Sequence, residues 1–397
     1  MITLVTSLHR FSKQLISLLT FFLAVTLVFG TFLPSVRAQE EEPVSVTTPQ
    51  QKNYQAVVTK ILTTGTEPLM DQLVPYQELE INITSGDKKN ETVQAKNSAG
   101  IQEGSAFSYQ EYKVGDKIRL TAFDSGQGEI IYTVAGKSRR EGLLTLGILF
   151  VVVVLIVGKL WGALSIAGLA ISFLVIFNLI IPMIIEGKDP IIAAIIGSII
   201  IIPLTFYVSH GWNKKTHVGV VATLVSLILT GVLAVYFVNA THLTGFASEE
   251  AGFLQVERQG SIDIRGLLLA GIIIGTLGIL DDITIGQASV VRQIKKSKPD
   301  ISFRELFKRG MSVGQDHISS MVNTLVLVYS GSALPLLLMF FGSQNSLTDV
   351  LEYELITEEI VRMLVGSIGL VLAAPLATAI AAFVFSRETE KKSRHTL

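Results

Sequence analysis

From residue 143 onward, apolar runs long enough to cross a bilayer recur along the chain, separated by short polar segments. Each predicted span must be a helix, because lipid offers the backbone no hydrogen-bond partners. The lengths exclude a transmembrane β-barrel, whose strands are about half as long. The pattern predicts seven spans: Leu143–Gly158, Leu160–Ile181, Pro190–Ser209, Val218–Val238, Gly266–Gly286, Ile318–Phe341 and Met363–Phe385.

Residues 1–38 have the plan of a secretory signal. A basic start is followed by an apolar run from Leu15 to Leu33, by Pro34, and by small residues ending at Ala38. The run of about 19 residues is slightly long for a signal peptide, so an uncleaved N-terminal anchor is the alternative. Both interpretations predict that the next segment is exported.

Residues 39–141 are polar and show period-2 alternation in several short runs. Gly- and Asp-containing turns separate these runs, which predicts a small exported β-rich domain, either a barrel or a sandwich. The predicted strands are Tyr54–Leu62, Gln77–Thr84, Asp116–Ala122 and Glu129–Val134.

Composition supports a membrane protein. Of 397 residues, 49% are hydrophobic and only 16% are charged, against about 25% charged in soluble proteins. The net charge of −1 offers no basic field for nucleic acid. The absence of cysteine excludes disulfides, thiol nucleophiles and Cys-ligated metals. No nucleotide-binding, metal-binding or catalytic motif is present, so we expect neither a cofactor nor an enzyme.

Lysine and arginine set the predicted orientation. With residues 39–141 exported, the outer loops are acidic and the inner loops are basic, which places the C-terminus in the cytoplasm. Lys137, Arg139 and Arg140 oppose this rule, because they precede the first span on the outer side. Long exported domains cross largely regardless of charge, so the assignment stands. The basic residues of the inner loops are Lys159, Lys214, Lys215, Arg292, Lys295, Lys296, Lys298, Arg304, Lys308 and Arg309.

The chain therefore has four predicted parts. Residues 1–38 are a signal peptide or N-terminal anchor, 39–141 an exported β-rich domain, 142–386 an all-α seven-helix transmembrane domain, and 387–397 a basic cytoplasmic tail. Between the fifth and sixth spans, the capping box that begins at Ser302 and the stop signal Gly310 predict a short interfacial helix.

The strongest candidate site lies in the fifth span, where Asp281 and Asp282 are adjacent. A charge at membrane depth costs at least about 2.5–3.5 kcal/mol, so it indicates a functional group by default. Asp282 shares a helical stripe with small residues, which predicts a helix-packing face and a carboxylate that points into the bundle. The glycines of this stripe are Gly271, Gly275, Gly278 and Gly286.

The sixth span supplies a polar stripe at a similar depth. A buried carboxylate beside these polar groups suits a proton or cation relay. The alternative is structural: Asp282 hydrogen-bonds a neighbouring side chain and fixes the register of the helices. The polar stripe consists of Asp316, Ser320, Asn323 and Thr324.

Three ordered blocks resemble the signature blocks of the YibE/F-like family of bacterial multi-pass membrane proteins. They are GIIIGTLGILDDITIGQASVV, GQDHISSMVNTLVLVYSGSALPLLL and VRMLVGSIGLVLAAPLATAIAA, and the resemblance covers about residues 140–385. In the family pattern the position of Asp282 carries an acid, whereas Asp281 departs from a usual apolar residue. The resemblance implies the helical architecture and supplies no substrate.

Two function hypotheses follow for a protein of the bacterial cell membrane. The first is a permease-like or transport-associated protein that moves an ion or small solute through a polar site around Asp282. The second is a non-transporting scaffold or assembly factor whose exported domain binds an envelope protein. In both, the bilayer is a partner and nucleic acid is not.

Overall fold

The computed structural model describes residues 52–69, 72–98, 109–124, 130–341 and 346–394. The chain forms two compact units, one within Pro34–Val153 and the other, over its described part, within Val154–Leu397. The predicted signal peptide or anchor at residues 1–38 lies outside the described residues.

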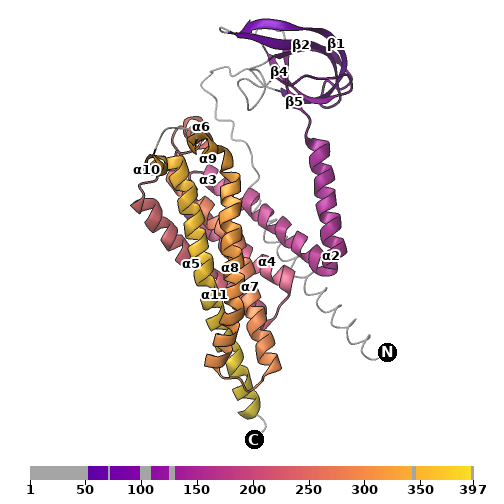
Figure 1. Ribbon diagram of the computed structural model, residues 1–397. Coiled ribbons are helices and arrows are strands. Elements are labelled where there is room, and N and C mark those ends of the chain that lie inside the picture. The colour runs from indigo at the N-terminus through magenta and orange to yellow at the C-terminus, as the bar shows by residue number, and fades with distance from the viewer. Residues whose placement is uncertain (1–51, 70–71, 99–108, 125–129, 342–345, 395–397) are drawn as a thin grey trace, which may run out of the picture. The chain divides into compact units, whose positions relative to one another are not determined.

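The first unit contains a closed five-stranded barrel with the strand order β1-β2-β3-β5-β4 (Figure 1). Neighbouring strands are antiparallel except for β3 and β5, which pair in parallel. This order is that of an OB-type barrel, a fold that by itself assigns no ligand. The predicted β-rich region is confirmed, with one strand (β3) that the alternation did not predict. The strands are β1 (Lys52–Leu69), β2 (Gln72–Ile83), β3 (Thr92–Ser98), β4 (Lys117–Asp124) and β5 (Ile130–Lys137).

Alternating side chains fill the barrel interior. On β2, Leu79, Ile81 and Ile83 are fully buried at every second position, as expected for a strand with one face on a core. Gln77 continues this row as a buried polar group. Its Oε1 accepts the backbone N–H of Tyr112 at 2.9 Å, and its Nε2 donates to the carbonyl of Tyr112 at 3.2 Å. One side chain thus holds the connecting segment against the barrel at Tyr112, whose side chain is buried while its neighbours are exposed.

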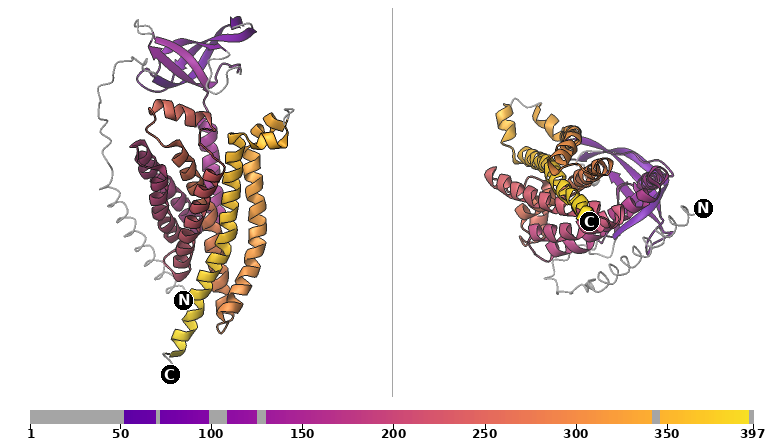
Figure 2. Two further views of the ribbon diagram at one scale, coloured as in Figure 1. Left: turned by 90° about the vertical axis from the view of Figure 1, so that its left-hand side faces the viewer. Right: turned by 90° about the horizontal axis from the view of Figure 1, so that it is seen from below.

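Helices follow the barrel along the chain (Figures 1 and 2). Asp189, Asn213, Ser248 and Ser302 each precede a helix and accept backbone N–H groups of its first turn, which is standard N-capping. The described helices are α2 (Arg140–Val175), η1 (Ile176–Ile180), α3 (Ile181–Ile185), α4 (Pro190–His210), α5 (Lys214–Ala240), α6 (Glu249–Glu257), α7 (Ile264–Ser297), α8 (Phe303–Ser332), α9 (Leu334–Phe341), α10 (Leu347–Leu351) and α11 (Glu354–Arg394).

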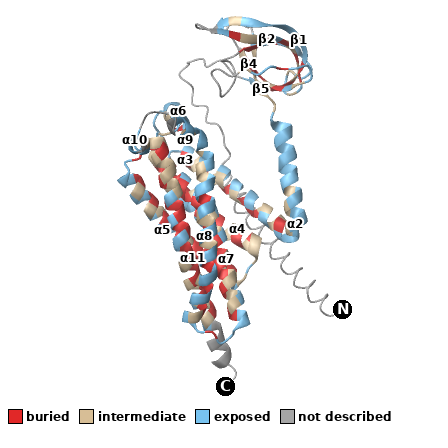
Figure 3. Cartoon of the chain, viewed as in Figure 1, coloured by how far each residue is buried: buried red, intermediate tan, exposed pale blue. Residues whose placement is uncertain are grey.

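Helices α5, α7 and α11 pack against one another, α4 packs on α7 and α5, and α8 packs on α11 and α7. Figure 3 shows buried residues concentrated along these helices and largely absent from the first part of α2. Glycines permit close approach: a Cβ on Gly219 would lie 2.7 Å from a ring atom of Phe206, and one on Gly369 would lie 2.3 Å from Thr230 Oγ1. Small residues take this role at helix interfaces in membranes.

Five helical stretches among the described residues are long and apolar enough to cross a membrane. The first covers both of the first two predicted spans and contains a break at Lys159, whose backbone has φ 50° and ψ −129°. Helices α8 and α9 occupy the sixth predicted span, but α8 is too polar to qualify. The chain is thus mostly helical with membrane-length apolar helices, while the number seven stays a prediction. The stretches are Arg140–Ile185, Pro190–His210, Lys214–Ala240, Ile264–Ser297 and Glu354–Arg387.

The prediction of a short interfacial helix that ends at Gly310 is wrong. The helix α8 begins as predicted, with Ser302 Oγ accepting the N–H of Glu305 at 3.4 Å, and it continues unbroken to Ser332. A Cβ on Gly310 would lie 2.9 Å from methyl groups of both Val291 and Thr378. This glycine therefore allows a close helix crossing and does not end the helix.

Candidate functional site

Polar side chains are buried between α5, α7 and α11. Thr223 of α5 and Thr284 of α7 share a hydrogen bond of 2.6 Å between their hydroxyl oxygens, and either can donate. Thr223 also donates to the carbonyl of Gly219 at 3.0 Å, as is usual for threonine in membrane helices. Ser226, less than one turn further along α5, has a buried hydroxyl with no partner among the described residues. The helical core is therefore not uniformly apolar.

Asp281 and Asp282 lie in different surroundings on α7. Asp281 is partly buried, and its Oδ1 is fully buried with no hydrogen-bond partner among the described residues. Asp282 is exposed. The expectation that Asp282 points into the bundle is therefore wrong for a single chain, and Asp281 is the more enclosed carboxyl. An unpartnered buried carboxylate oxygen is costly, so it marks a position that a proton or a cation would stabilise.

The glycine stripe predicted as a packing face is mostly open. A Cβ added to Gly271, Gly275 or Gly278 would meet no described atom within 4 Å. A Cβ on Gly286 would lie 3.8 Å from Cε1 of His317, where α8 approaches α7. Within one described chain, three of the four glycines thus have no helix against them. The helix-packing face predicted for Gly271, Gly275 and Gly278 is therefore not found among the described residues of a single chain.

The polar stripe of α8 also faces away from the bundle. Asp316, Ser320, Asn323 and Thr324 are all exposed, whereas Leu325 on the opposite side of the helix is buried. The described hydrogen bond of this group runs within the helix, from Thr324 Oγ1 to the carbonyl of Ser320 at 3.0 Å. The polar site predicted from the sequence is therefore not assembled as one buried cluster within a single chain.

The structure reveals a buried polar pair that the sequence reasoning missed, Gln287 of α7 and Thr378 of α11. Gln287 is only 1% exposed, and its Oε1 accepts from Thr378 Oγ1 at 3.0 Å. Its amide is accommodated because Gly314 of α8 has no side chain, since a Cβ there would lie 2.9 Å from Nε2. The signal was available in principle: Gln287 is a polar residue within the apolar fifth helix.

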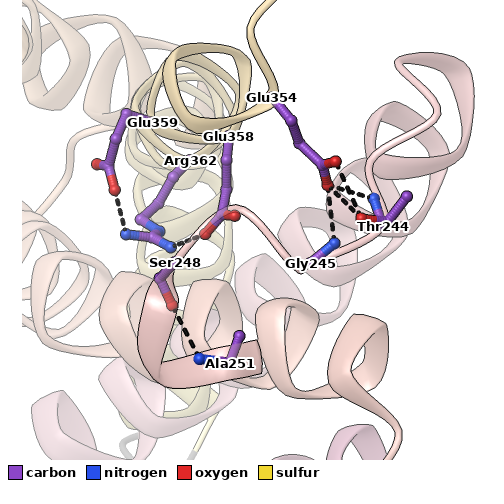
Figure 4. Close-up of polar contacts among 8 residues, drawn as sticks. All are labelled: Thr244, Gly245, Ser248, Ala251, Glu354, Glu358, Glu359 and Arg362. Atoms are coloured by element: carbon purple, nitrogen blue, oxygen red, sulfur yellow. Dashed lines mark hydrogen bonds and ion pairs between the residues drawn. The ribbon is translucent and has the colours of Figure 1, made fainter. Parts of the chain in front are cut away.

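A second polar cluster lies where α11 begins (Figure 4). The carboxylate of Glu354 accepts the backbone N–H of Thr244 at 2.5 Å and that of Gly245 at 2.9 Å, which ties the loop after α5 to α11. On α11 itself, Arg362 donates to Glu358 at 2.5 Å and to Glu359 at 2.7 Å. The single Arg362 bridges two glutamates of its own helix, and Glu354 holds the loop, so the cluster fits a structural clasp.

Among the described residues, no group of three or more His, Asp or Glu side chains is placed to hold a metal ion. The candidate site therefore comprises the polar side chains of α5, α7, α8 and α11 described above.

Comparison with protein families matches residues 146–387 to the family model described as YibE/F-like protein. The match covers more than half of the chain. The chain belongs to the YibE/F-like family. No curated protein and no solved structure matches it.

The matched region begins in the first part of α2 and ends in α11 at Arg387. The barrel precedes the matched region in the sequence. Asp281, Asp282, Gln287 and Thr378 all lie within the YibE/F-like region. Together with the apolar helices, membership indicates a membrane protein.

Proposed function

We propose that the YibE/F-like helical domain takes part in transport and moves an ion or a small solute across the membrane. The observation that carries the proposal is the buried Oδ1 of Asp281, which has no hydrogen-bond partner among the described residues. An ionised carboxylate in that position is stabilised by taking up a proton or a cation. A group that binds and releases such a species at membrane depth is what a coupled transporter requires.

The exposed polar faces of α7 and α8 support the same proposal. Asp282 on α7, and Asp316 and Asn323 on α8, are open in the single chain. Polar and charged groups at membrane depth normally face protein or water, because lipid cannot hydrogen-bond them. A water-filled path, or a second copy that encloses one, would satisfy them. The proposal includes no catalytic step, since the sequence has no catalytic motif.

The test is flux into proteoliposomes that contain the full-length protein, measured for protons and for monovalent cations. We expect flux with the unchanged protein, and a loss of at least about tenfold with Asp281→Asn, which keeps the shape and removes the charge. Asp282→Asn reports whether the exposed neighbour shares the role. Asp300→Asn, at an exposed position between α7 and α8, is the matched control and should leave flux unchanged.

Unfolding in detergent is measured on the same samples. Absence of flux from a folded, unchanged protein would overturn the transport proposal, and flux equal to that of the unchanged protein in all three variants would overturn the role of Asp281 in it. An Asp281→Asn protein that transports normally but unfolds more easily would make this carboxyl a structural group.

The second candidate is a membrane scaffold whose barrel binds an envelope protein. It is supported by the closed barrel, which has its own core and forms a compact unit separate from the helical one. Deletion of residues 44–136 distinguishes the two functions in cells. Loss of all function in the deletion, with function retained in the Asp281→Asn and Asp282→Asn proteins, would favour the scaffold. Retained function in the deletion would exclude it.

We also propose that the barrel faces the outside of a bacterial cell and that the C-terminus is cytoplasmic. The support is the basic segment between α7 and α8, which includes Lys298, Arg304 and Lys308, against the acidic loops at the opposite helix ends. The chain has no cysteine, so single cysteines can be introduced without background. A membrane-impermeant thiol reagent should label Lys89→Cys and not Lys298→Cys in intact cells, and the reverse result would invert the orientation.

A further inference from the structure

A cavity of about 570 Å³ lies in the barrel unit, where β4 and β5 meet the start of α2. Its charged lining consists of Arg119, Lys137, Arg139 and Arg140, and no carboxylate side chain lines it. The cavity, which is partly open to solvent, therefore joins a volume of ligand size to a concentration of positive charge.

The positions of Arg139 and Arg140 are unfavourable for the chain alone. Arg139 and Arg140 stand at the first turn of α2, where the helix dipole already places positive partial charge. Glu141 follows but pairs with Lys117, and Asp116 pairs with Lys137 at 2.8 Å. The same three residues, Lys137, Arg139 and Arg140, break the charge rule for outer loops. An anion in the cavity would relieve this repulsion.

The remaining lining indicates what kind of anion fits. Leu143 and Leu144 belong to the wall and are 65% and 55% exposed. They begin the apolar part of α2, which meets the length and hydropathy of a membrane span. The cavity therefore lies at the N-terminal end of a candidate membrane span, and its lining contains both cations and apolar side chains.

We propose that this cavity binds the phosphate of an anionic lipid head group, with the guanidinium groups on the phosphate oxygens and the two leucines against the start of the acyl chains. Arginine suits this role, because its planar fork donates two hydrogen bonds to one phosphate. Free phosphate ions share the recognised chemistry, and the apolar wall favours the lipid. The site is distinct from the membrane-depth carboxyls of α7 and stands independently of the transport proposal.

The test uses the full-length protein in an uncharged detergent. Short-chain phosphatidylglycerol and phosphatidylcholine are added at equal concentration, and bound lipid is counted by native mass spectrometry. We expect preferential retention of phosphatidylglycerol, and a fall in its affinity of at least about tenfold in the double variant Arg139→Gln, Arg140→Gln. The double variant Lys60→Gln, Lys89→Gln removes two exposed charges of the barrel outside the cavity and should bind as before.

Inorganic phosphate, added as a competitor, identifies the source of the anion. Displacement of phosphatidylglycerol only at a large excess of phosphate supports the lipid head group. Displacement at equal concentration supports phosphate recognition with the free ion as the ligand. Equal retention of both lipids, or a tenfold loss in the control double variant as well, would overturn the proposal. Hydrogen exchange of the β4 and β5 peptides, compared across variants, verifies that the barrel remains folded.

Discussion

The contact between α5 and α11 depends on a glycine. A Cβ at position 369 would lie 2.3 Å from Thr230 Oγ1 and 2.9 Å from Thr230 Cγ2. Thr230 cannot easily give way, because it is 1% exposed and its hydroxyl donates to the carbonyl of Ser226 at 2.8 Å. Its β-branched side chain also has few rotamers within a helix. Gly369→Ala must therefore push the two helices apart.

The magnitude follows from two opposing effects. Overpacking a buried site costs about 1–3 kcal/mol, and replacing a helical glycine by alanine returns about 0.5–1 kcal/mol. We expect Gly369→Ala to lower the free energy of unfolding by about 1–2 kcal/mol. Gly331→Ala on α8 is the matched control, because its Cβ would meet no described atom within 4 Å.

The assay is unfolding in mixed micelles by titration with a denaturing detergent, followed by tryptophan fluorescence. A second substitution sharpens it: Thr230→Ala removes the two closest atoms and leaves only Cβ, at 3.2 Å from the new methyl group. The Gly369→Ala, Thr230→Ala protein should therefore be more stable than the sum of the single changes, by about 1 kcal/mol. Equal stability of Gly369→Ala and Gly331→Ala, or strict additivity in the double variant, would refute the close-contact interpretation.

Two further predictions concern the barrel, and hydrogen exchange of its peptides in the full-length protein measures both. Leu79→Ala removes a fully buried side chain and should destabilise the barrel by about 2–5 kcal/mol. Hydrogen exchange in α7 should not change. Unchanged protection of the barrel peptides would contradict the packing of Leu79. The hydrogen bond from Lys137 lowers the pKa of Asp116 below its usual value of 3.8, so this pair stabilises the barrel above that pH and loses its effect as the pH falls through the lowered pKa. Because the pair is partly exposed, the acid-induced loss of barrel stability should be below about 1 kcal/mol. This loss should be absent in Asp116→Asn. An equal loss of stability in acid in that variant would contradict the role of the pair.

The sequence predicted strands well where large apolar residues alternate. The predicted Gln77–Thr84 lies almost entirely within β2, because Leu79 and Ile81 alternate with polar residues on its outer face. The alternation pattern did not predict β3 (Thr92–Ser98). The inner face of that strand buries Ala95 and Asn97, so no strong hydrophobic period is present. Strands that bury small and polar groups are not visible to a pattern based on hydrophobicity.

The helices were predictable as segments and much less so as neighbours. Helical spacing correctly separated Asp281 from Asp282, but it could not tell which side of α7 faces protein. In soluble helices the apolar side identifies the core, whereas in lipid both sides can be apolar. The buried side of α7 instead carries Thr284 and Gln287, and the glycine stripe beside Asp282 is open. Only the structure therefore shows which side of α7, and which of its polar residues, faces the other helices.

Closure of the barrel limits how a protein partner could bind it. The first strand pairs with β4 over Lys52–Val57 and with β2 over Ala56–Leu69, so among the described strands the sheet returns on itself and each strand has a neighbour on both sides. Partners of open sheets often add a strand of their own to a free edge, a mode known as β-augmentation. Closure leaves little free edge for that mode, mainly where β3 and β5 pair only at Lys96 and Thr133, and it also disfavours edge-to-edge aggregation. We therefore expect an envelope protein that recognises this unit to bind mainly through its loops and outer side chains, so that binding is more sensitive to substitutions there than to backbone pairing.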